Sequence, residues 1–104
     1  PAPVVTGEGI AGEVVSVDRF GNLISNIGRP ALDALLRDGR VEIRLGGHAI
    51  PRLVATYAEA AAGEICALVG STDHLEIAVN GASAAGHFAA GTGTPVTVRR
   101  RAGV

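Results

Sequence analysis

Two apolar runs separated by a short polar stretch dominate this sequence between residues 65 and 79. The first run, residues 65–69, is unbroken, as expected of a strand that is covered on both faces. In the second run Leu75, Ile77 and Val79 alternate with Glu, Ala and Asn, which is the pattern of a half-buried strand. Residues 70–73, Gly-Ser-Thr-Asp, are typical turn formers. The stretch therefore predicts a β-hairpin.

Shorter segments of the same kind recur along the chain. Residues 1–9 contain few core formers and are interpreted as a linker or lead-in, and Arg99 to Arg101 as a solvated basic tail. In the strand after the lead-in, Val15 and Val17 are expected to share one face. The remaining strands are predicted at residues 13–18, 23–27, 41–45, 48–54 and 95–99.

Two segments favour short helices. Pro30 suits the first turn of a helix because its nitrogen needs no hydrogen bond there, and Gly39 suits the left-handed end. Residues 82–88 could form a second helix capped by Asn80 or Ser83. About seven short strands with one or two short helices predict an all-β fold, an antiparallel barrel or sandwich, as one domain over residues 10–104.

Composition excludes several classes of function. The formal net charge is −1 and only 3% of residues are aromatic, which disfavours nucleic-acid binding. No apolar run approaches the roughly 20 residues of a membrane span, so no membrane partner is expected. A single cysteine, Cys66, permits no intrachain disulfide and favours a reducing compartment, so we expect a cytoplasmic location. The three histidines lack metal-ligand spacing, so no metal site is predicted.

No nucleophile–base pair is evident, so no catalytic residue is assigned in this chain. Ser71, Asp73 and His74 are crowded into one turn, whereas a triad needs groups from separate elements. Cys66 within an apolar run is interpreted as a small buried hydrophobe. By residue type alone, Phe20 is most simply core and Asn22 most simply a turn former.

Two motifs nevertheless resemble a known family. Residues 18–27 read Asp-Arg-Phe-Gly-Asn-Leu-Ile-Ser-Asn-Ile, and residues 68–83 include the hairpin described above. In this order and spacing they resemble the C-terminal domain of the S-adenosylmethionine hydroxide adenosyltransferases, whose relatives are the fluorinase and the chlorinase. The resemblance spans about residues 12–98. It implies a small closed β-barrel.

The resemblance also implies an activity. The family displaces methionine from the 5′ carbon of S-adenosylmethionine, and with hydroxide as nucleophile the products are adenosine and L-methionine. The substrate is the only small molecule implied, so no cofactor is expected. The substrate lies between the N-terminal domain of one subunit and the C-terminal domain of its neighbour, usually in a trimer. This chain would then be the substrate-binding part of a two-domain enzyme and inactive by itself, because the missing N-terminal domain positions the nucleophile.

Individual residues match the family's substrate contacts. The resemblance assigns Asn22 to the adenine edge, because its amide offers both a donor and an acceptor. Ser71 matches a contact to the methionine end, and Glu76 a possible contact to the ribose or the amino group. The other matched residues surround the adenine: Phe20 and Tyr57 with their rings, and Val79, Asn80 and Gly81 with their backbone.

The sequence differs from the fluorinase at two positions, and two other functions are compatible with it. The fluorinase has arginines where this chain has Thr72 and Val79, which favours the hydroxide-using branch. The nucleophile itself is chosen by the missing domain, so hydroxide and halide are both left open. A stand-alone module that binds a nucleotide-like ligand, or an oligomerisation domain without chemistry, would have a similar composition.

Overall fold

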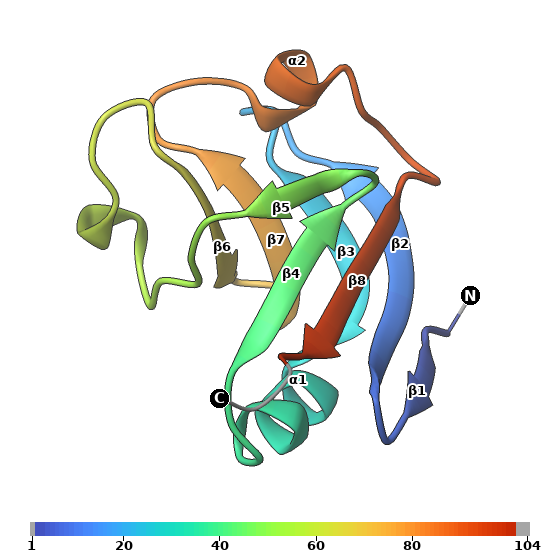
Figure 1. The fold of residues 1–104 in the computed structure, drawn as a ribbon. Helices are drawn as coiled ribbons and strands as arrows, with labels where there is room; N and C mark the ends of the chain where they lie inside the picture. The colour runs from blue at the N-terminus through green and yellow to red at the C-terminus, as the bar shows by residue number, and fades with distance from the viewer. Residues whose placement is uncertain (1, 102–104) are drawn as a thin grey trace.

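The structure, a computed structural model, describes residues 2–101 and forms a nearly closed antiparallel barrel (Figure 1). The barrel strands follow one another in the order β5-β4-β8-β2-β3-β7-β6, and β1 pairs with β2 outside this path. The elements are β1 (Val4–Thr6), β2 (Gly9–Val17), β3 (Leu23–Gly28), α1 (Arg29–Leu36), β4 (Val41–Leu45), β5 (His48–Ile50), the 3-10 turn η1 (Tyr57–Glu59), β6 (Ile65–Val69), β7 (His74–Val79), α2 (Ala84–Phe88) and β8 (Pro95–Arg100).

The predicted all-β barrel with two short helices is confirmed. The hairpin of β6 and β7 is the one that the apolar runs predict, with Ala67 opposite Ile77. The two edge strands of the barrel, β5 and β6, are bridged by residues 52–54, which follow β5. The backbone N–H of Val54 donates to the Ala67 carbonyl at 2.8 Å, and the N–H of Ala67 donates to the Arg52 carbonyl at 2.9 Å. The strand predicted over residues 48–54 is shorter than expected and ends before Pro51, which cannot donate to a ladder.

The inside of the barrel is apolar. Side chains from six strands are less than 2% exposed there, among them Leu23, Ile27, Leu45, Leu75, Ile77, Val96 and Val98. A second, smaller cluster lies on the outer face of β6 and β7, where Val54 and Ala60 cover Cys66, Leu68 and Ala78. The unbroken apolar run of β6 is thus explained, because both faces of this strand are covered, as predicted.

The N-terminal part differs from the sequence-based expectation. Residues 4–6 form strand β1 where a lead-in was expected, and β2 begins at Gly9. A bulge between Val14 and Ser16 changes the register, so that Val14 is buried. Val15, which was expected to share a face with Val17, lies in the bulge, whereas Val17 stands opposite the core residue Leu23. The two valines are 39% and 40% exposed.

Three smaller expectations are settled by the helices and the C-terminal strand. Helix α1 begins at Arg29, one residue before Pro30, and α2 is capped by Ser83, whose hydroxyl accepts from Gly86 at 3.0 Å. Arg99 and Arg100 extend β8 and are not part of a tail. No helix within residues 2–101 has the length and apolar character needed to cross a membrane.

Candidate functional site

A cleft lies outside the barrel, between the β2–β3 turn, η1 and the segment that follows β7. It consists of two adjoining hollows of about 560 Å³ and about 400 Å³, which share Phe20, Asn22 and Tyr57. These volumes suit a small ligand. The first hollow is completed by Val79, Gly81, Ala82 and Ser83, and the second by residues that include Asp18, Gly70, Ser71 and Glu76.

The turn between β2 and β3 holds Asn22 in the cleft. One carboxylate oxygen of Asp18 accepts the backbone N–H groups of Phe20 and Asn22, both at 2.9 Å. The other accepts a hydrogen bond from Nδ2 of Asn22 at 3.0 Å. Asn22 is only 8% exposed, and its amide is fixed by a hydrogen bond to the Asp18 carboxylate.

Gly21 allows this turn to pack against the start of α2. Its φ is +84°, a conformation that side-chain-bearing residues rarely adopt, and Ala85 donates its backbone N–H to the Gly21 carbonyl at 2.9 Å. A Cβ at this position would lie 2.0 Å from the hydroxyl oxygen of Ser83. The two walls of the first hollow therefore meet through a residue without a side chain.

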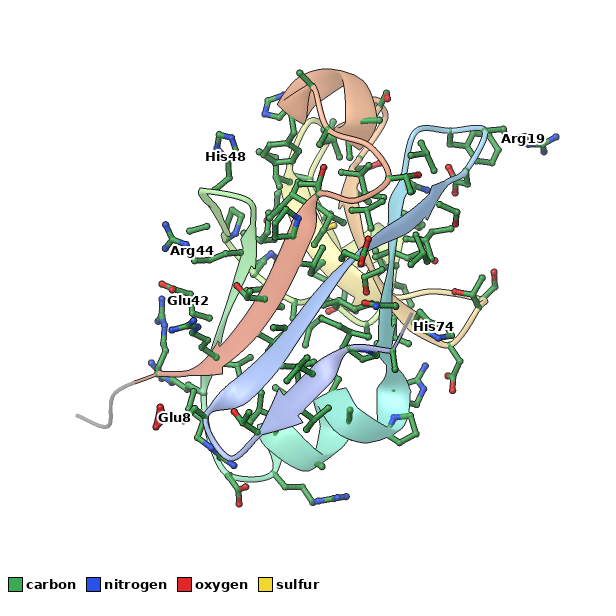
Figure 2. All side chains as sticks on the ribbon, turned by 90° about the vertical axis from the view of Figure 1, so that its right-hand side faces the viewer. Glu8, Arg19, Glu42, Arg44, His48 and His74 are labelled. Atoms are coloured by element: carbon green, nitrogen blue, oxygen red, sulfur yellow. The ribbon has the colours of Figure 1, made fainter. Side chains whose placement is uncertain are left out.

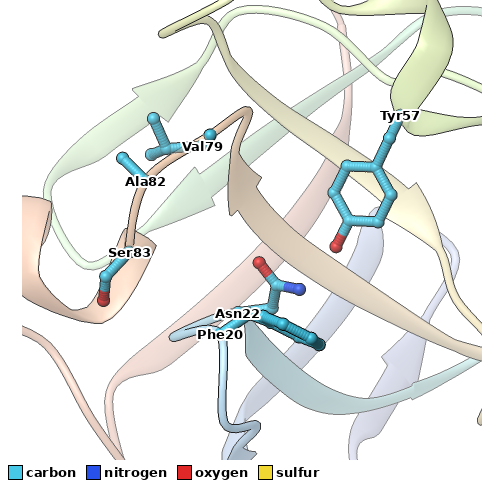
Figure 3. Close-up of a pocket in the computed structure, with 7 residues that line it drawn as sticks. Phe20, Asn22, Tyr57, Val79, Ala82 and Ser83 are labelled. Atoms are coloured by element: carbon cyan, nitrogen blue, oxygen red, sulfur yellow. The ribbon is translucent and has the colours of Figure 1, made fainter.

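Two aromatic rings lie beside Asn22 (Figure 3). Phe20, whose residue type alone suggested a core position, is instead 63% exposed because it stands on a surface turn. The guanidinium of Arg19 lies 4.9 Å from the centre of its ring, and Figure 2 shows Arg19 extending from this turn. An exposed phenylalanine in a cleft can be covered by a planar ligand.

Tyr57 faces Phe20 and Asn22 from η1. The turn is held by a capping box in which the Glu59 carboxylate accepts from the backbone of Ala55 and Thr56, at 2.9 and 3.0 Å. Burial raises the pKa of Tyr57 to about 12, the charges of Glu76 and Asp18 add to the rise, and the side chain of Asn22 opposes it. The phenol is therefore neutral at physiological pH.

Glu76 lies at the inner end of the second hollow. The alternation of β7 places it on the face opposite Leu75 and Ile77, yet it is only 6% exposed because the η1 segment covers this side of the sheet. Among residues 2–101 its carboxylate has no hydrogen-bond or ion-pair partner, and a Cβ on Gly70 would lie 1.6 Å from one of its oxygens. Burial raises its pKa, and the charge of Asp18 adds to the rise.

The raised pKa of Glu76 predicts a pH-dependent stability. A carboxyl with a higher pKa in the folded state favours folding while it is protonated, and this contribution is lost as the pH rises from its unfolded-state pKa of about 4.3 through its folded-state pKa. We therefore expect Glu76→Gln to raise Tm relative to the parent more at about pH 7.5 than at about pH 4. Glu8→Gln, at an exposed turn, is the control. An equal effect of Glu76→Gln at both values would contradict the prediction.

Of the remaining residues assigned by resemblance, three line the cleft and one does not. Ser71 lines the second hollow from the hairpin turn, and Val79 and Gly81 line the first. Asn80 does not line either hollow, because its Nδ2 donates to the carbonyl of Ala60 at 2.8 Å. Its side chain holds the η1 segment in place.

The lining residues of the cleft that sequence reasoning did not assign include Asp18, Ala82 and Ser83. For Asp18 a signal was available, because an Asp four residues before Asn22 with a glycine between them is typical of a turn that the carboxylate caps. Ala82 and Ser83 carry no such signal. They reach the cleft only because β7 ends beside the β2–β3 turn.

Other reactive side chains do not converge on the cleft. His48 and His74 lie well apart (Figure 2), and within residues 2–101 no three His, Cys, Asp or Glu side chains are grouped to hold a metal ion. His48 and His87 both pack against the ring of Phe88, with centroids 5.2 and 4.8 Å away. Cys66 is fully buried, and burial raises the pKa of its thiol, as expected for a structural cysteine.

Comparison with known proteins identifies the family. A family model described as the SAM hydroxide adenosyltransferase C-terminal domain matches residues 12–97. The (R)-S-adenosyl-L-methionine hydrolase of Thermus thermophilus is 37% identical over 94 residues, which are 90% of this chain and 34% of that protein. The protein of the same name from Salinispora tropica is 37% identical over 87 residues, 82% of this chain and 31% of that protein.

Solved structures agree with the family match. A conserved protein from Thermotoga maritima superposes with a TM-score of 0.75 at 30% identity, over 96% of this chain and 38% of that one. A conserved protein from Thermus thermophilus gives a TM-score of 0.68 at 30% identity, over 94% and 37%. The chain spans about a third of the length of the curated relatives that it matches. The chain belongs to the S-adenosylmethionine hydroxide adenosyltransferase family and corresponds to its C-terminal domain.

Proposed function

We propose that this chain is the substrate-binding domain of an enzyme that cleaves S-adenosylmethionine to adenosine and L-methionine, with hydroxide from water as nucleophile. Its family and the names of two relatives support this reaction. The observation that carries the proposal is the buried amide of Asn22 beside two aromatic rings, Phe20 and Tyr57, in the first hollow of the cleft, which has a volume of about 560 Å³. A polar edge between apolar faces suits a purine.

In this proposal Asn22 reads the adenine. Its Oδ1 accepts from the N6 amino group and its Nδ2 donates to N7. Phe20 and Tyr57 contact the base, and the backbone of residues 79–81 lies along its edge. Ser71 and Glu76, in the adjoining hollow, contact the ribose or the methionine end. A carboxylate there suits the positive charge of the substrate's ammonium group.

The chemistry itself requires a second domain. The positive sulfonium makes methionine a good leaving group, so the main catalytic demands are orientation and desolvation of the nucleophile. We propose that the family's N-terminal domain supplies the groups that hold the hydroxide, across a subunit interface in a homotrimer in the cytoplasm. The reaction needs no cofactor. The exposed cleft described above would be closed by the neighbouring subunit.

The adenine assignment is tested with two variants of the cleft. Asn22→Ala is expected to weaken adenosine binding by about 1–3 kcal/mol, because the buried base edge loses its partner. Ser71→Ala is expected to cost less, about 0.5–1.5 kcal/mol, because Ser71 lies on an exposed turn where water can replace it. Dissociation constants from NMR titration of the labelled chain give both values.

Ligand-free thermal melts are the control for this comparison, because Asn22 also stabilises its turn through Asp18. If Asn22→Ala melts like the parent and binds adenosine equally well, the assignment of Asn22 is wrong and the proposed function loses its main support.

The chain alone is expected to be inactive. No nucleophile–base pair is evident among the described residues of the cleft, and the phenol of Tyr57, with a pKa of about 12, stays protonated at physiological pH. Incubation of the purified chain with S-adenosylmethionine should release adenosine only at the rate of the buffer, as measured by chromatography. Release above this background, lost in Asn22→Ala, would show that the domain carries its own catalytic group.

A further inference from the structure

We propose that Asp18 determines which way round the amide of Asn22 faces the cleft, and so makes the site select a purine with an amino group at C6 over one with a carbonyl there. The inference rests on the proposed function, because it assumes that Asn22 meets a purine base. It adds a positioning residue and the chemical basis of base selection. Asp18 was not among the residues assigned from the sequence.

The contacts of Asp18 leave the Asn22 amide one favourable orientation. A carboxylate only accepts hydrogen bonds, so its oxygen 3.0 Å from the amide requires the nitrogen of Asn22 on that side. Rotation of the amide by 180° would place two acceptors against each other and lose a charge-assisted hydrogen bond. The other Asp18 oxygen is held by two backbone N–H groups at 2.9 Å, so the carboxylate cannot move away to accommodate the rotated amide.

The fixed amide presents an oxygen to the first hollow. Figure 3 shows the oxygen of Asn22 on the side of Val79 and Ala82, and the nitrogen on the side of Tyr57. An acceptor at this place pairs with the amino group at C6 of adenine. Hypoxanthine has a carbonyl oxygen at C6, so its two acceptors would oppose each other and one buried hydrogen bond would be lost. The same base would keep only the contact at N7.

Asp18→Asn is the substitution that reverses this arrangement with little change of shape. The two backbone N–H groups of the turn still need an acceptor, so the oxygen of the introduced amide takes the place that they contact. The NH2 group of the introduced amide then faces Asn22, where a donor requires an oxygen. The Asn22 amide is expected to turn round and present its nitrogen to the position that meets C6.

The experiment measures base preference in the whole chain. Parent and Asp18→Asn, both labelled with nitrogen-15, are titrated with adenosine and with inosine, and dissociation constants are taken from the amide shifts. The parent is expected to prefer adenosine by about tenfold or more, the cost of one buried mismatch. In Asp18→Asn the ratio should fall to about one or below, through weaker adenosine binding, while inosine binding changes little because it exchanges one mismatch for another.

The outcomes separate this inference from the proposed function. If the parent binds neither nucleoside, the proposed function fails and the inference fails with it. If the parent prefers adenosine and Asp18→Asn keeps that preference, only the role of Asp18 is overturned. If Asp18→Asn does not give a folded spectrum, Asp18→Ser replaces it, because a serine hydroxyl can still cap the turn. The preference of this variant should fall toward one without inverting, and an unchanged preference would again overturn the role of Asp18.

Discussion

Gly21→Ala is expected to destabilise the domain by roughly 2–5 kcal/mol, the sum of backbone strain and overpacking at this position. The backbone φ of +84° is unfavourable for alanine, and the added Cβ would lie 2.0 Å from the hydroxyl oxygen and 2.9 Å from the Cα of Ser83. The hydroxyl can rotate away, but the Cα belongs to the chain that enters α2. The β2–β3 turn and α2 must therefore separate.

Gly63→Ala is the matched control for this effect. Gly63 has a similar φ of +77°, but nothing lies within 4 Å of the position of its Cβ. This variant should lose only the conformational part, about 1 kcal/mol. Urea unfolding of both variants gives the difference, which is the cost of the close approach to Ser83. Equal losses in the two variants would mean that the turn and α2 do not pack as described.

Gly21→Ala should also weaken ligand binding in the cleft. Ser83 lines the first hollow, and Gly21 stands between Phe20 and Asn22. Adenosine binding by Gly21→Ala should therefore be weaker than binding by Gly63→Ala at a urea concentration where both are folded. Stability and binding are linked here because one turn supplies both the packing and the polar edge.

Most strands of this fold could be predicted from the sequence because their signal is local. Alternating apolar residues mark β4, β7 and β8, and Val96 and Val98 are buried as expected. The pairing of residues 9–13 with 95–99 could not be predicted in this way, because it joins the two ends of the chain. Gly9 illustrates the reason. A Cβ there would lie 2.2 Å from the carbonyl oxygen of Val98, so the glycine is required by a distant strand.

In the cleft, too, some features could be predicted from the sequence and others depend on distant segments. The family resemblance pointed to Phe20, Asn22 and Tyr57, and the structure brings these three side chains together although Tyr57 lies far from the other two in the sequence. The burial of Glu76 could not be read from β7, because the alternation assigns it to the outer face. Glu76 is buried because the η1 segment covers the outer face of β7. A hydrogen bond from the Asn80 amide to the Ala60 carbonyl holds this segment in place.

Strand β7, which lies between β3 and β6, is expected to be the part of the core where substitutions lower stability most. Ile77 is fully buried on β7, where it stands opposite Leu23 of β3 on one side and Ala67 of β6 on the other. Its side chain therefore fills the barrel between three strands. Ile77→Ala removes three carbons that the surrounding ladders cannot close around, and we expect a loss of about 2–5 kcal/mol in the free energy of unfolding.

A graded series tests whether this loss arises from packing. Ile77→Val removes one carbon from the same place and should cost about 0.5–1.5 kcal/mol. Val17→Ala removes two carbons from β2 where the side chain is 40% exposed, and should change stability by no more than about 0.5 kcal/mol. Urea unfolding with a common slope gives the three values. If Ile77→Ala costs no more than Val17→Ala, residue 77 does not lie inside the barrel, and the register that places Glu76 toward the cleft is wrong as well, because adjacent residues of a strand point to opposite faces.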